Sequence, residues 1–305
     1  MAKADITPAV VSALIAEQFP QWSDLAVSPV ELDGWDNTTF RLGDELSVRL
    51  PSADGYVAQV DKEHRWLPIL ARQLPLAIPE PVARGRPGVA FPRPWSIYRW
   101  LHGQPARLEH LTGVEELAAD LAGFLAALYA ISPAGGPRPG PHNSFRGGPL
   151  DTYDLETRRS IEALAGVIDA EAISSVWDMA LAATWDRSPV WIHGDVTASN
   201  LLVVDGRLSA VIDFGCAAVG DPACDLVMAW TFFVGDSRVA FRRGIPLDDA
   251  TWARGRGWAL WKALITLVEH RDRGTDAEAA AARFGWRHGA RMVIDEVLAD
   301  HVRST

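Results

Sequence analysis

The stretch 191–226, WIHGDVTASNLLVVDGRLSAVIDFGCAAVGDPACDL, carries three short motifs in a fixed order. The hydrophobic WIHGD leads into a loop that holds Asp195, and Asn200 follows five residues later. LLVV and LSAVID, separated by Asp205-Gly206, predict a β-hairpin, because Asp-Gly is a favoured turn dipeptide. Asp213 stands where the second strand ends. We therefore expect the hairpin to bring Asn200 and Asp213 to one edge of a common site.

Phosphoryl transfer from a nucleotide requires groups of this kind. An acceptor hydroxyl needs a carboxylate that orients it and takes its proton, which is the role we expect for Asp195. The nucleotide phosphates need divalent cations that bridge their oxygens, and Mg²⁺ prefers hard oxygen ligands. We therefore predict Asp195 as the catalytic residue, and Asn200 with Asp213 as the metal ligands.

The same stretch resembles the aminoglycoside phosphotransferase family, which phosphorylates antibiotics and other small molecules. HGD-x4-N, IDFG and GDPxxDL occur together in that family, and here they occupy 193–200, 212–215 and 220–226. Single Asp and Asn residues are common in turns, but three ordered motifs within 36 residues indicate function. The resemblance implies an α+β, two-lobed protein-kinase-like fold, with a small antiparallel-sheet N-lobe and a larger, mainly helical C-lobe. It also implies Mg²⁺, and ATP or GTP as the phosphoryl donor.

Length and composition fit an enzyme of two compact units. The chain has 305 residues, of which 48% are hydrophobic, and can bury a substantial core. Nothing near Met1 resembles a signal peptide, and no apolar run reaches the roughly 18 residues that a membrane span needs. Cys216 and Cys224 offer neither a disulfide framework nor a zinc cluster. We expect a cytoplasmic protein with both thiols reduced.

The net charge of −10 argues against a nucleic-acid partner and favours a cationic substrate. The acidic excess is uneven, because 103–190 hold 12 acidic and 6 basic side chains whereas 225–305 hold 11 and 12. A surface that attracts cations should therefore lie within 103–190. Solvated helix faces account for most charge of this kind without any function.

The first part of the chain, 1–101, is predicted to be the nucleotide-binding lobe. A helix should begin at Pro8, with Thr7 as its N-terminal cap. Three short strand-like runs follow, at 27–32, 37–43 and 45–51.

The polar loop 34–38, between the first two runs, is a candidate phosphate loop. Asn37 and Thr38 match the family position at which a polar side chain meets phosphate. The loop has a single glycine, Gly34, so an ordinary polar turn fits its composition equally well.

Arg49 stands where kinase-like folds place a strand lysine that binds the α- and β-phosphates. Arginine keeps a permanent positive charge and has a bidentate fork suited to phosphate. The resemblance implies a glutamate partner on the next helix, here Glu63 within 59–70. Lys62 is the nearest lysine, but it adjoins Glu63 on that helix and should point elsewhere. We predict the ion pair Arg49–Glu63.

The proline-rich stretch 74–99 predicts short strands joined by rigid turns, the last of them a buried strand at 96–98. The resemblance implies that the hinge between the lobes follows, where main-chain groups from Arg99 to Leu101 bind the edge of the purine base. Composition alone predicts only the end of a strand there.

The remainder, 102–305, is predicted to be the catalytic lobe that binds the acceptor. Helices are expected at 114–131, 152–168, 174–185, 226–234, 252–271 and 276–301. The Gly- and Pro-rich stretch 132–150 is long for an irregular segment. We favour a flexible surface loop there over an ordered segment near the acceptor. The frequent tryptophans mostly fill cores in proteins, although some can stack on an acceptor ring.

Two residues of the motif block are predicted to support the chemistry without performing it. His193 has the pKa range of a base, yet in this fold we expect it to hold the loop by hydrogen bonds. The resemblance implies that Asp225 anchors the backbone of the catalytic loop.

Together these features predict a Mg²⁺-dependent kinase that moves the γ-phosphoryl of ATP or GTP to a hydroxyl of a small molecule. We expect an antibiotic as acceptor, an aminoglycoside first and a macrolide second. A kinase for a sugar, an amino alcohol or homoserine shares every motif quoted and stays open. The missing strand lysine motivates another alternative, a catalytically silent nucleotide-binding regulator. A protein kinase is disfavoured, because no Ala-Pro-Glu follows Asp213.

Overall fold

The computed structural model describes residues 3–31, 34–283 and 285–304, and the chain divides into two compact units. Unit 1 comprises Met1–Gln73, Ala77–His102 and Asp213–Gly215. Unit 2 comprises Leu74–Leu76, Gly103–Ile212 and Cys216–Thr305. The Asp213 motif thus belongs to unit 1, although the residues on both sides of it belong to unit 2.

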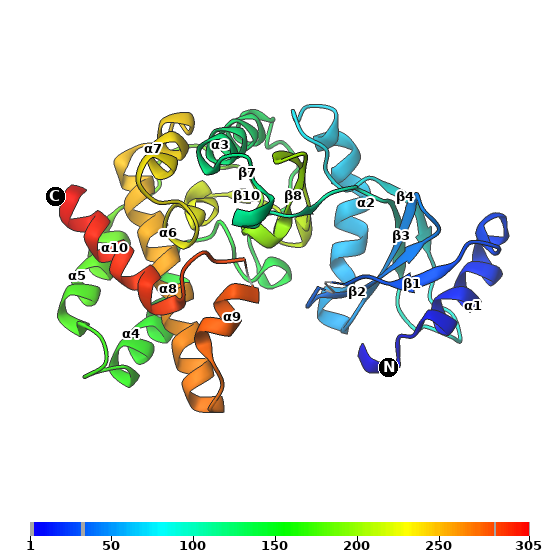
Figure 1. Ribbon diagram of the computed structural model, residues 1–305, viewed down its shortest axis with the longest axis horizontal. Helices are drawn as coiled ribbons and strands as arrows, with labels where there is room; N and C mark the ends of the chain where they lie inside the picture. The colour runs from blue at the N-terminus through cyan, green and yellow to red at the C-terminus, as the bar shows by residue number, and fades with distance from the viewer. Residues whose placement is uncertain (1–2, 32–33, 284, 305) are drawn as a thin grey trace. The chain divides into compact units, whose positions relative to one another are not determined.

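A five-stranded antiparallel sheet forms the centre of unit 1, in the order β1-β2-β3-β5-β4. Its strands are β1 (Val27–Pro29), β2 (Asn37–Leu42), β3 (Leu46–Pro51), β4 (Pro81–Gly85) and β5 (Trp95–Arg99). The helices α1 (Pro8–Gln18) and α2 (Val57–Ala71) cover opposite faces of this sheet (Figure 1). The strand predicted over 27–32 is shorter than expected, and Leu32 lies outside the described residues.

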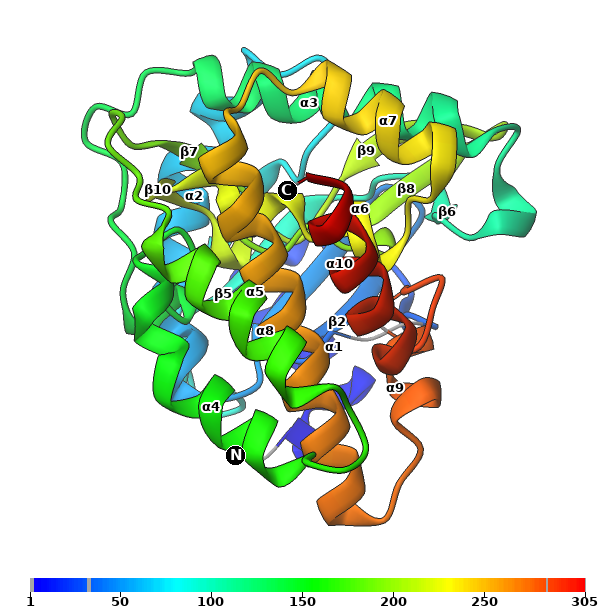
Figure 2. The same cartoon turned by 90° about the vertical axis from the view of Figure 1, so that its left-hand side faces the viewer.

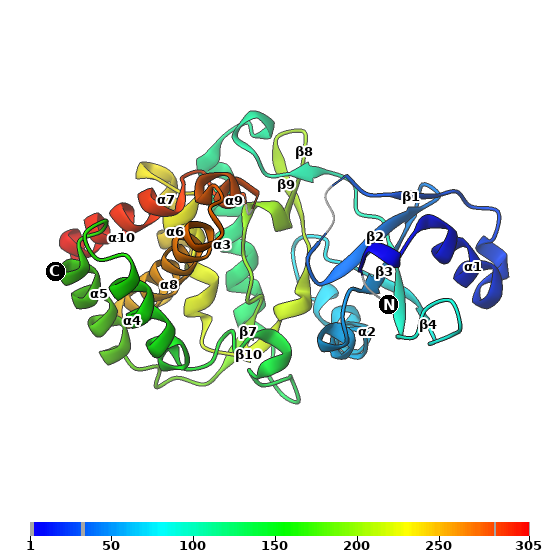
Figure 3. The same ribbon diagram turned by 90° about the horizontal axis from the view of Figure 1, so that it is seen from below.

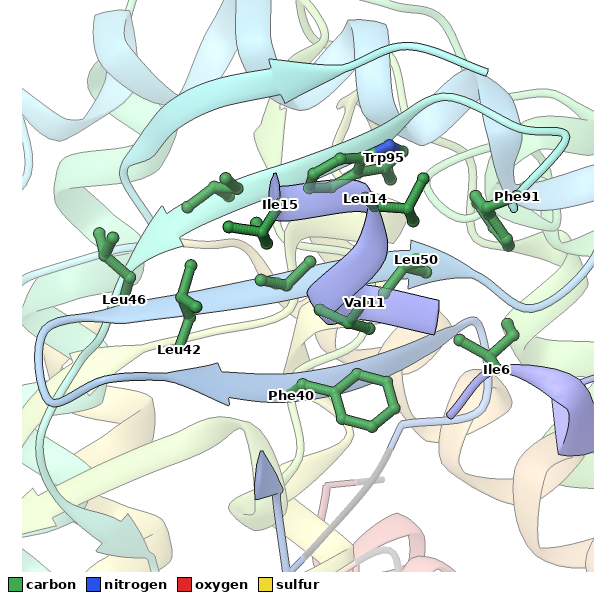
Figure 4. Packing of buried hydrophobic residues seen from close by; sticks show 12 residues of the cluster. Ile6, Val11, Leu14, Ile15, Phe40, Leu42, Leu46, Leu50, Phe91 and Trp95 are labelled. Carbon is green, nitrogen blue, oxygen red and sulfur yellow. The ribbon is translucent and has the colours of Figure 1, made fainter. Parts of the chain in front are cut away.

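Alternation along the strands gives this sheet two chemically different faces. Val48 packs under α1, which begins as predicted, with the Thr7 hydroxyl accepting from the Val10 N–H at 3.4 Å. The apolar cluster on this face (Figure 4) consists of Ile6, Val11, Leu14, Ile15, Phe40, Leu42, Leu46, Val48, Leu50, Phe91, Trp95 and Ile97. Arg49, the next residue along β3, reaches Glu63 of α2 instead. The sheet therefore buries its core on one face and keeps its charged groups on the other.

Trp95 closes the edge of this core against a glycine. Gly85 on β4 lies opposite Trp95 on β5, and the fully buried indole fills the space that a Cβ at Gly85 would need. Trp95 also meets Phe19 edge-on, with ring centroids 5.5 Å apart. Close approach of the ring, and not a positive φ, therefore requires glycine at this position.

Unit 2 is mainly helical. Its helices are α3 (Val114–Ala130), α4 (Asp154–Ala163), α5 (Ala170–Ala182), α6 (Met228–Thr231), α7 (Gly235–Gly244), α8 (Asp249–Arg273), α9 (Ala277–Arg283) and α10 (Ala290–Ser304). The long helix α8 lies beside α5 and α10, and α3 lies beside α7 (Figure 2). The sequence did not predict α7, and Phe284, within the predicted helical stretch 276–301, lies outside the described residues. No helix of the described residues is both long and apolar enough to cross a membrane.

Two small sheets carry the motifs of unit 2. The predicted hairpin consists of β8 (Leu201–Val204) and β9 (Arg207–Val211) (Figure 3). The short strand β6 (Gln104–Pro105) pairs with β8. The hairpin's turn residues Asp205 and Gly206 have φ angles of 50° and 78°, the sign that a type I′ turn requires. The strand before HGD, β7 (Val190–Ile192), pairs with β10 (Ala218–Gly220), which ends in the first residue of GDPxxDL.

The stretch 132–150 is ordered, so the prediction of a flexible surface loop is wrong. Asn143 is buried, and its amide donates to the carbonyls of Arg146 and Cys216 at 2.9 and 3.1 Å. The Gly147 carbonyl accepts from the Asp221 N–H at 2.8 Å. A short 3-10 helix, Pro141–Asn143, and hydrogen bonds of buried groups hold this segment, and its composition gave no sign of them.

The packing of Trp95 predicts that Gly85→Ala destabilises the protein. The added methyl group would overlap the buried indole, and overpacking of this kind costs about 1–3 kcal/mol in the free energy of unfolding. Urea denaturation measures it. Gly55→Ala is the matched control, because no described atom lies within 4 Å of a Cβ there. Equal unfolding free energies for the two variants would contradict the packing.

Candidate active site

A buried carboxylate fixes the HGD loop. Asp225 has no exposed surface, and its two oxygens accept from the N–H groups of His193 and Gly194 at 3.0 and 2.7 Å. Burial raises the pKa of Asp225, although His193 and the two N–H groups act to lower it. Gly194 has a φ of 82°, and a Cβ there would lie 2.6 Å from the Cys216 carbonyl oxygen, so glycine is required. The anchoring role implied for Asp225 is confirmed.

His193 holds the loop, as predicted, and is not placed as a base. Its buried ring lies with Nε2 2.9 Å from the Ile212 carbonyl, and Nδ1 accepts from the Asp195 N–H at 3.2 Å. Since Nδ1 accepts, Nε2 carries the proton and donates. The ring therefore ties the loop to the strand end that precedes Asp213.

Asp195 presents its carboxylate beside a lysine. Lys262 Nζ, on α8, donates to Asp195 Oδ1 at 2.8 Å, and 35% of the Asp195 side chain is exposed. Within the described part of the chain, no hydrogen bond reaches Oδ2. Burial would raise the pKa of Asp195, but Lys262 and Arg146 lower it to about 2. Asp195 is therefore ionised at neutral pH and can accept a hydrogen bond from an acceptor hydroxyl.

Asn200 contacts the same loop. The side-chain Nδ2 of Asn200 donates to the Asp195 main-chain carbonyl at 3.0 Å. The main-chain carbonyl of Asn200 accepts from the Ile212 N–H at 2.8 Å. Because the amide nitrogen is used in this way, the amide oxygen is the atom left for a cation. Asp213 follows Ile212 directly, with a φ of 66° that aspartate tolerates better than most residues. The hydrogen bond from Ile212 thus connects the main chain of Asn200 to the residue before Asp213.

In unit 1, Arg49 contacts two carboxylates. Its Nη1 lies 3.7 Å from Glu63 Oε2, and its Nη2 donates to Asp213 Oδ1 at 3.3 Å. The Tyr98 hydroxyl donates to Glu63, and the Arg49 guanidinium lies over the Tyr98 ring. Burial would lower the pKa of Arg49, but Glu63 and Asp213 outweigh burial and raise it. The expected pair Arg49–Glu63 is present, and its cation is permanently charged.

Lys62 is not a second partner for Glu63. Its Nζ donates to the main-chain carbonyl of Gly215 at 2.5 Å. Adjacent residues of α2 thus reach different targets, and Lys62 binds the backbone of the IDFG motif.

Asn37 and Thr38 are the first residues of β2 and not part of the preceding loop, and both side chains are buried. Thr38 pairs across the ladder with Leu50. No described residue offers a hydrogen-bond partner to the buried Thr38 Oγ1. Lys3 Nζ donates to the carbonyls of Gly34 and Asn37, one at each end of the loop.

Arg99 and Leu101 lie at the end of β5 and beyond it. The N–H groups of Arg99 and Trp100 donate to the carbonyls of Glu80 and Glu45 at 2.9 and 2.8 Å. The exposed Arg99 side chain pairs with Glu80 at 3.1 Å. Two of the main-chain donors predicted to bind the base are therefore used within the protein.

Unit 1 has a cavity of about 520 Å³, and neither Arg49 nor its partners Glu63 and Asp213 line it. It is lined by Trp22, Leu25, Leu42, Asp44, Glu45, Leu46, Val82 and Arg99. Leu42 and Leu46 belong to the α1 face of the sheet, whereas Arg49 and Glu63 meet on the α2 face. The sheet therefore lies between this cavity and the ion pair of Arg49 with Glu63.

The sequence did not single out the two cations beside Asp195. Lys262 comes from α8, 67 residues further along the chain, and Arg146 from the stretch 132–150. The Arg146 guanidinium lies over Trp258 and Trp261 of α8, 5.3 and 4.6 Å from the ring centroids. The one available signal was composition, because only three of the 29 Lys and Arg residues are lysines.

Solved structures of antibiotic kinases share this fold. The GDP complex of wild-type aminoglycoside 2′-phosphotransferase IIIa has a TM-score of 0.71 at 20% identity, covering 97% of this chain and 100% of that one. A macrolide 2′-phosphotransferase from Brachybacterium faecium has a TM-score of 0.58 at 22% identity, covering 90% and 97%. The predicted α+β, protein-kinase-like fold, with an antiparallel-sheet lobe and a larger helical lobe, is confirmed.

The sequence also matches known proteins directly. An aminoglycoside 3′-phosphotransferase of Escherichia coli is 28% identical over 151 residues, which are 45% of this chain and 51% of that protein. The chain thus spans about half the length of this curated relative. Residues 27–258 match the model of the phosphotransferase enzyme family, and all three motifs lie inside that region. The chain therefore belongs to the phosphotransferase enzyme family.

Proposed function

We propose that this protein transfers the γ-phosphoryl group of ATP or GTP to a hydroxyl of a small molecule, in the first place an aminoglycoside. The observation that carries the proposal is the HGD loop, in which Asp225 holds the backbone and an ionised Asp195 keeps one oxygen uncommitted. A similar structure holds both GDP and kanamycin, which supports this donor and acceptor class. Such a donor fits a cytoplasmic enzyme.

Asp195 is the catalytic residue in this proposal. It orients the acceptor hydroxyl and takes its proton as the oxygen attacks phosphorus. Its low pKa makes it a weak base. Orientation and electrostatics therefore supply most of the acceleration, as is usual for phosphoryl transfer.

Asn200 and Asp213 fit Mg²⁺ by the chemistry of their donor atoms. Asn200 offers an amide oxygen, and Asp213 a carboxylate that is 37% exposed. Asn200 and Asp213 would hold the ion, because Mg²⁺ prefers hard oxygen donors and takes few of them from a protein. When bound, the ion supplies positive charge to the β- and γ-phosphates.

Arg49 binds the nucleotide phosphates in place of the strand lysine, with Glu63 and Tyr98 holding it. Asn37 and Thr38 are assigned to the same phosphates. Asn37 lies on the Arg49 face of the sheet, whereas Thr38 pairs with Leu50 of the α1 face, so Asn37 is the better placed of the two.

Main-chain groups from Arg99 to Leu101 bind the purine edge. Because the N–H groups of Arg99 and Trp100 are used within the protein, carbonyl oxygens and the Leu101 N–H are the groups left for this role. In this division of roles, residues 1–101 bind the nucleotide and 102–305 provide the catalytic loop and the acceptor site.

A macrolide is the second candidate acceptor. The charges that act on Asp195 include the cations Lys262 and Arg146, and a largely neutral acceptor fits such surroundings better than a polycation does. The fold likeness to a macrolide 2′-phosphotransferase supports the same candidate.

A coupled nucleotide-consumption screen of the purified protein tests the function. It should compare aminoglycosides, macrolides and small hydroxylated metabolites, with ATP and GTP as donors. We expect Mg²⁺-dependent consumption when an aminoglycoside is added. Consumption with a macrolide or a metabolite alone would reassign the acceptor, and consumption with no acceptor at all would refute the kinase.

Asp195→Asn should reduce kcat by about 10²- to 10⁴-fold, because the amide cannot take the proton. Nucleotide affinity, measured by calorimetry, should stay within about twofold, since Asp195 is assigned to the acceptor and not to the nucleotide. Asp205→Asn is the matched control, because Asn also accepts the left-handed turn position of Asp205. Substantial transfer by the Asp195 variant would contradict the assignment.

Asp213→Asn should weaken Mg²⁺-dependent nucleotide binding by about tenfold or more, or at least about 1.4 kcal/mol. It removes the charge while keeping a residue that tolerates a φ of 66°, which Ala would not. Calorimetry with Mg²⁺ and with EDTA separates the metal-dependent part. An affinity that responds to Mg²⁺ as in the wild type would exclude Asp213 as a ligand.

A further inference from the structure

Lysine is rare in this chain, and each lysine contacts a functional motif. Lys3, Lys62 and Lys262 are the three lysines among 29 Lys and Arg residues. Lys3 donates to the backbone of the loop before β2, and Lys62 to the backbone of the IDFG motif. Lys262 donates to the Asp195 carboxylate. Lys262 lies outside residues 27–258, the part that the family model matches, whereas Asp195 lies inside it.

The helix α8 holds Lys262 in place. The preceding residue, Trp261, is buried and its Nε1 donates to Glu156 at 2.7 Å. The Thr266 hydroxyl donates to the Lys262 carbonyl at 2.8 Å. The Lys262 side chain is itself only 18% exposed. The ammonium group therefore reaches Asp195 from a packed helix and not from a free surface.

The contact engages one carboxylate oxygen. Lys262 Nζ lies 2.8 Å from Asp195 Oδ1, and no described residue bonds to Oδ2. A lysine ammonium is a compact point charge, whereas an arginine fork matches both oxygens of a carboxylate. The ammonium of Lys262 thus holds Asp195 through one oxygen, whereas an arginine fork at the same position can take both.

Arg146 adds positive charge without competing for these oxygens. Its guanidinium lies over the rings of Trp258 and Trp261, and within the described chain its Nε and Nη1 have no hydrogen-bond partner. Lys262 is therefore the cation that sets the orientation of Asp195.

We propose that Lys262 is a positioning residue for phosphoryl transfer, which holds Asp195 through Oδ1 and leaves Oδ2 for the acceptor hydroxyl. The inference rests on the proposed function for the identity of the reaction. Without the ammonium, the carboxylate can rotate, and the hydroxyl loses its fixed acceptor.

Two substitutions separate charge from geometry. Lys262→Met removes the ammonium, and Lys262→Arg keeps a cation but adds a fork that takes both oxygens. Both should lower kcat by about 10- to 100-fold while the nucleotide KM stays within about twofold, because misplacement of a reacting group costs rate. Arg273→Met, at an exposed cation near the end of α8, is the control and should behave as the wild type.

Chemical rescue distinguishes positioning from a folding defect. In Lys262→Ala, methylammonium added to the assay should restore part of kcat, because it returns a point charge to Oδ1. Guanidinium should not, because it binds both oxygens. A kcat close to the wild-type value in Lys262→Met or Lys262→Arg would overturn the proposal.

Because the chain has three lysines, NMR can detect the contact between Lys262 and Asp195 without any enzyme assay. Protein labelled with ¹³C at the lysine Cε should give one NMR signal for each lysine, and Lys262→Arg identifies the signal of Lys262. Asp195→Asn should shift that signal and leave the other two in place. An unmoved Lys262 signal would refute the inference, whereas absence of transfer by the wild type would refute the proposed function.

Discussion

The two hydrogen bonds that Asp225 accepts from the HGD loop are the interaction on which the rest of the candidate site depends. They satisfy two buried N–H groups, each of which would cost about 1–3 kcal/mol if left unpaired. From this anchor the His193 ring reaches the N–H of Asp195 on one side and the carbonyl of Ile212 on the other. One fully buried carboxylate thus positions the catalytic loop and the strand end that precedes Asp213.

The two units contain charge clusters of opposite design. In unit 1 a cation is central, with Arg49 between Glu63 and Asp213. In unit 2 a carboxylate is central, because the cations Lys262 and Arg146 both lower the pKa of Asp195. A held guanidinium suits a polyphosphate, and a held carboxylate suits a hydroxyl that must lose its proton. The division matches the donor and acceptor roles that we propose for the two parts of the chain.

Much of this arrangement could be predicted from the sequence where the constraint is local. The Asp205-Gly206 turn fixes the hairpin, and the spacing from Asp195 to Asn200 places the amide on the catalytic loop. The fold class followed from three motifs that occur together. The anchoring role of Asp225 followed from the family resemblance that these motifs carry.

The rest depends on tertiary contacts that leave no spacing in the sequence. Lys262 meets Asp195 across 67 residues, and nothing in α8 marks it apart from the rarity of lysine. Asn143 orders a Gly- and Pro-rich segment through buried hydrogen bonds that composition cannot reveal. Asn37 and Thr38 were placed both in the loop 34–38 and in the strand run 37–43, and the structure assigns them to the strand, β2.

In the proposed reaction, Asp195 guides the acceptor oxygen directly onto the γ-phosphorus, and no phosphorylated enzyme forms. The stereochemical course at phosphorus measures this, using nucleotide made chiral at the γ-phosphate with oxygen isotopes. A single in-line transfer inverts the configuration, and inversion is the result that we expect. Retention would indicate two successive transfers through a covalent intermediate such as an aspartyl phosphate, and would contradict it.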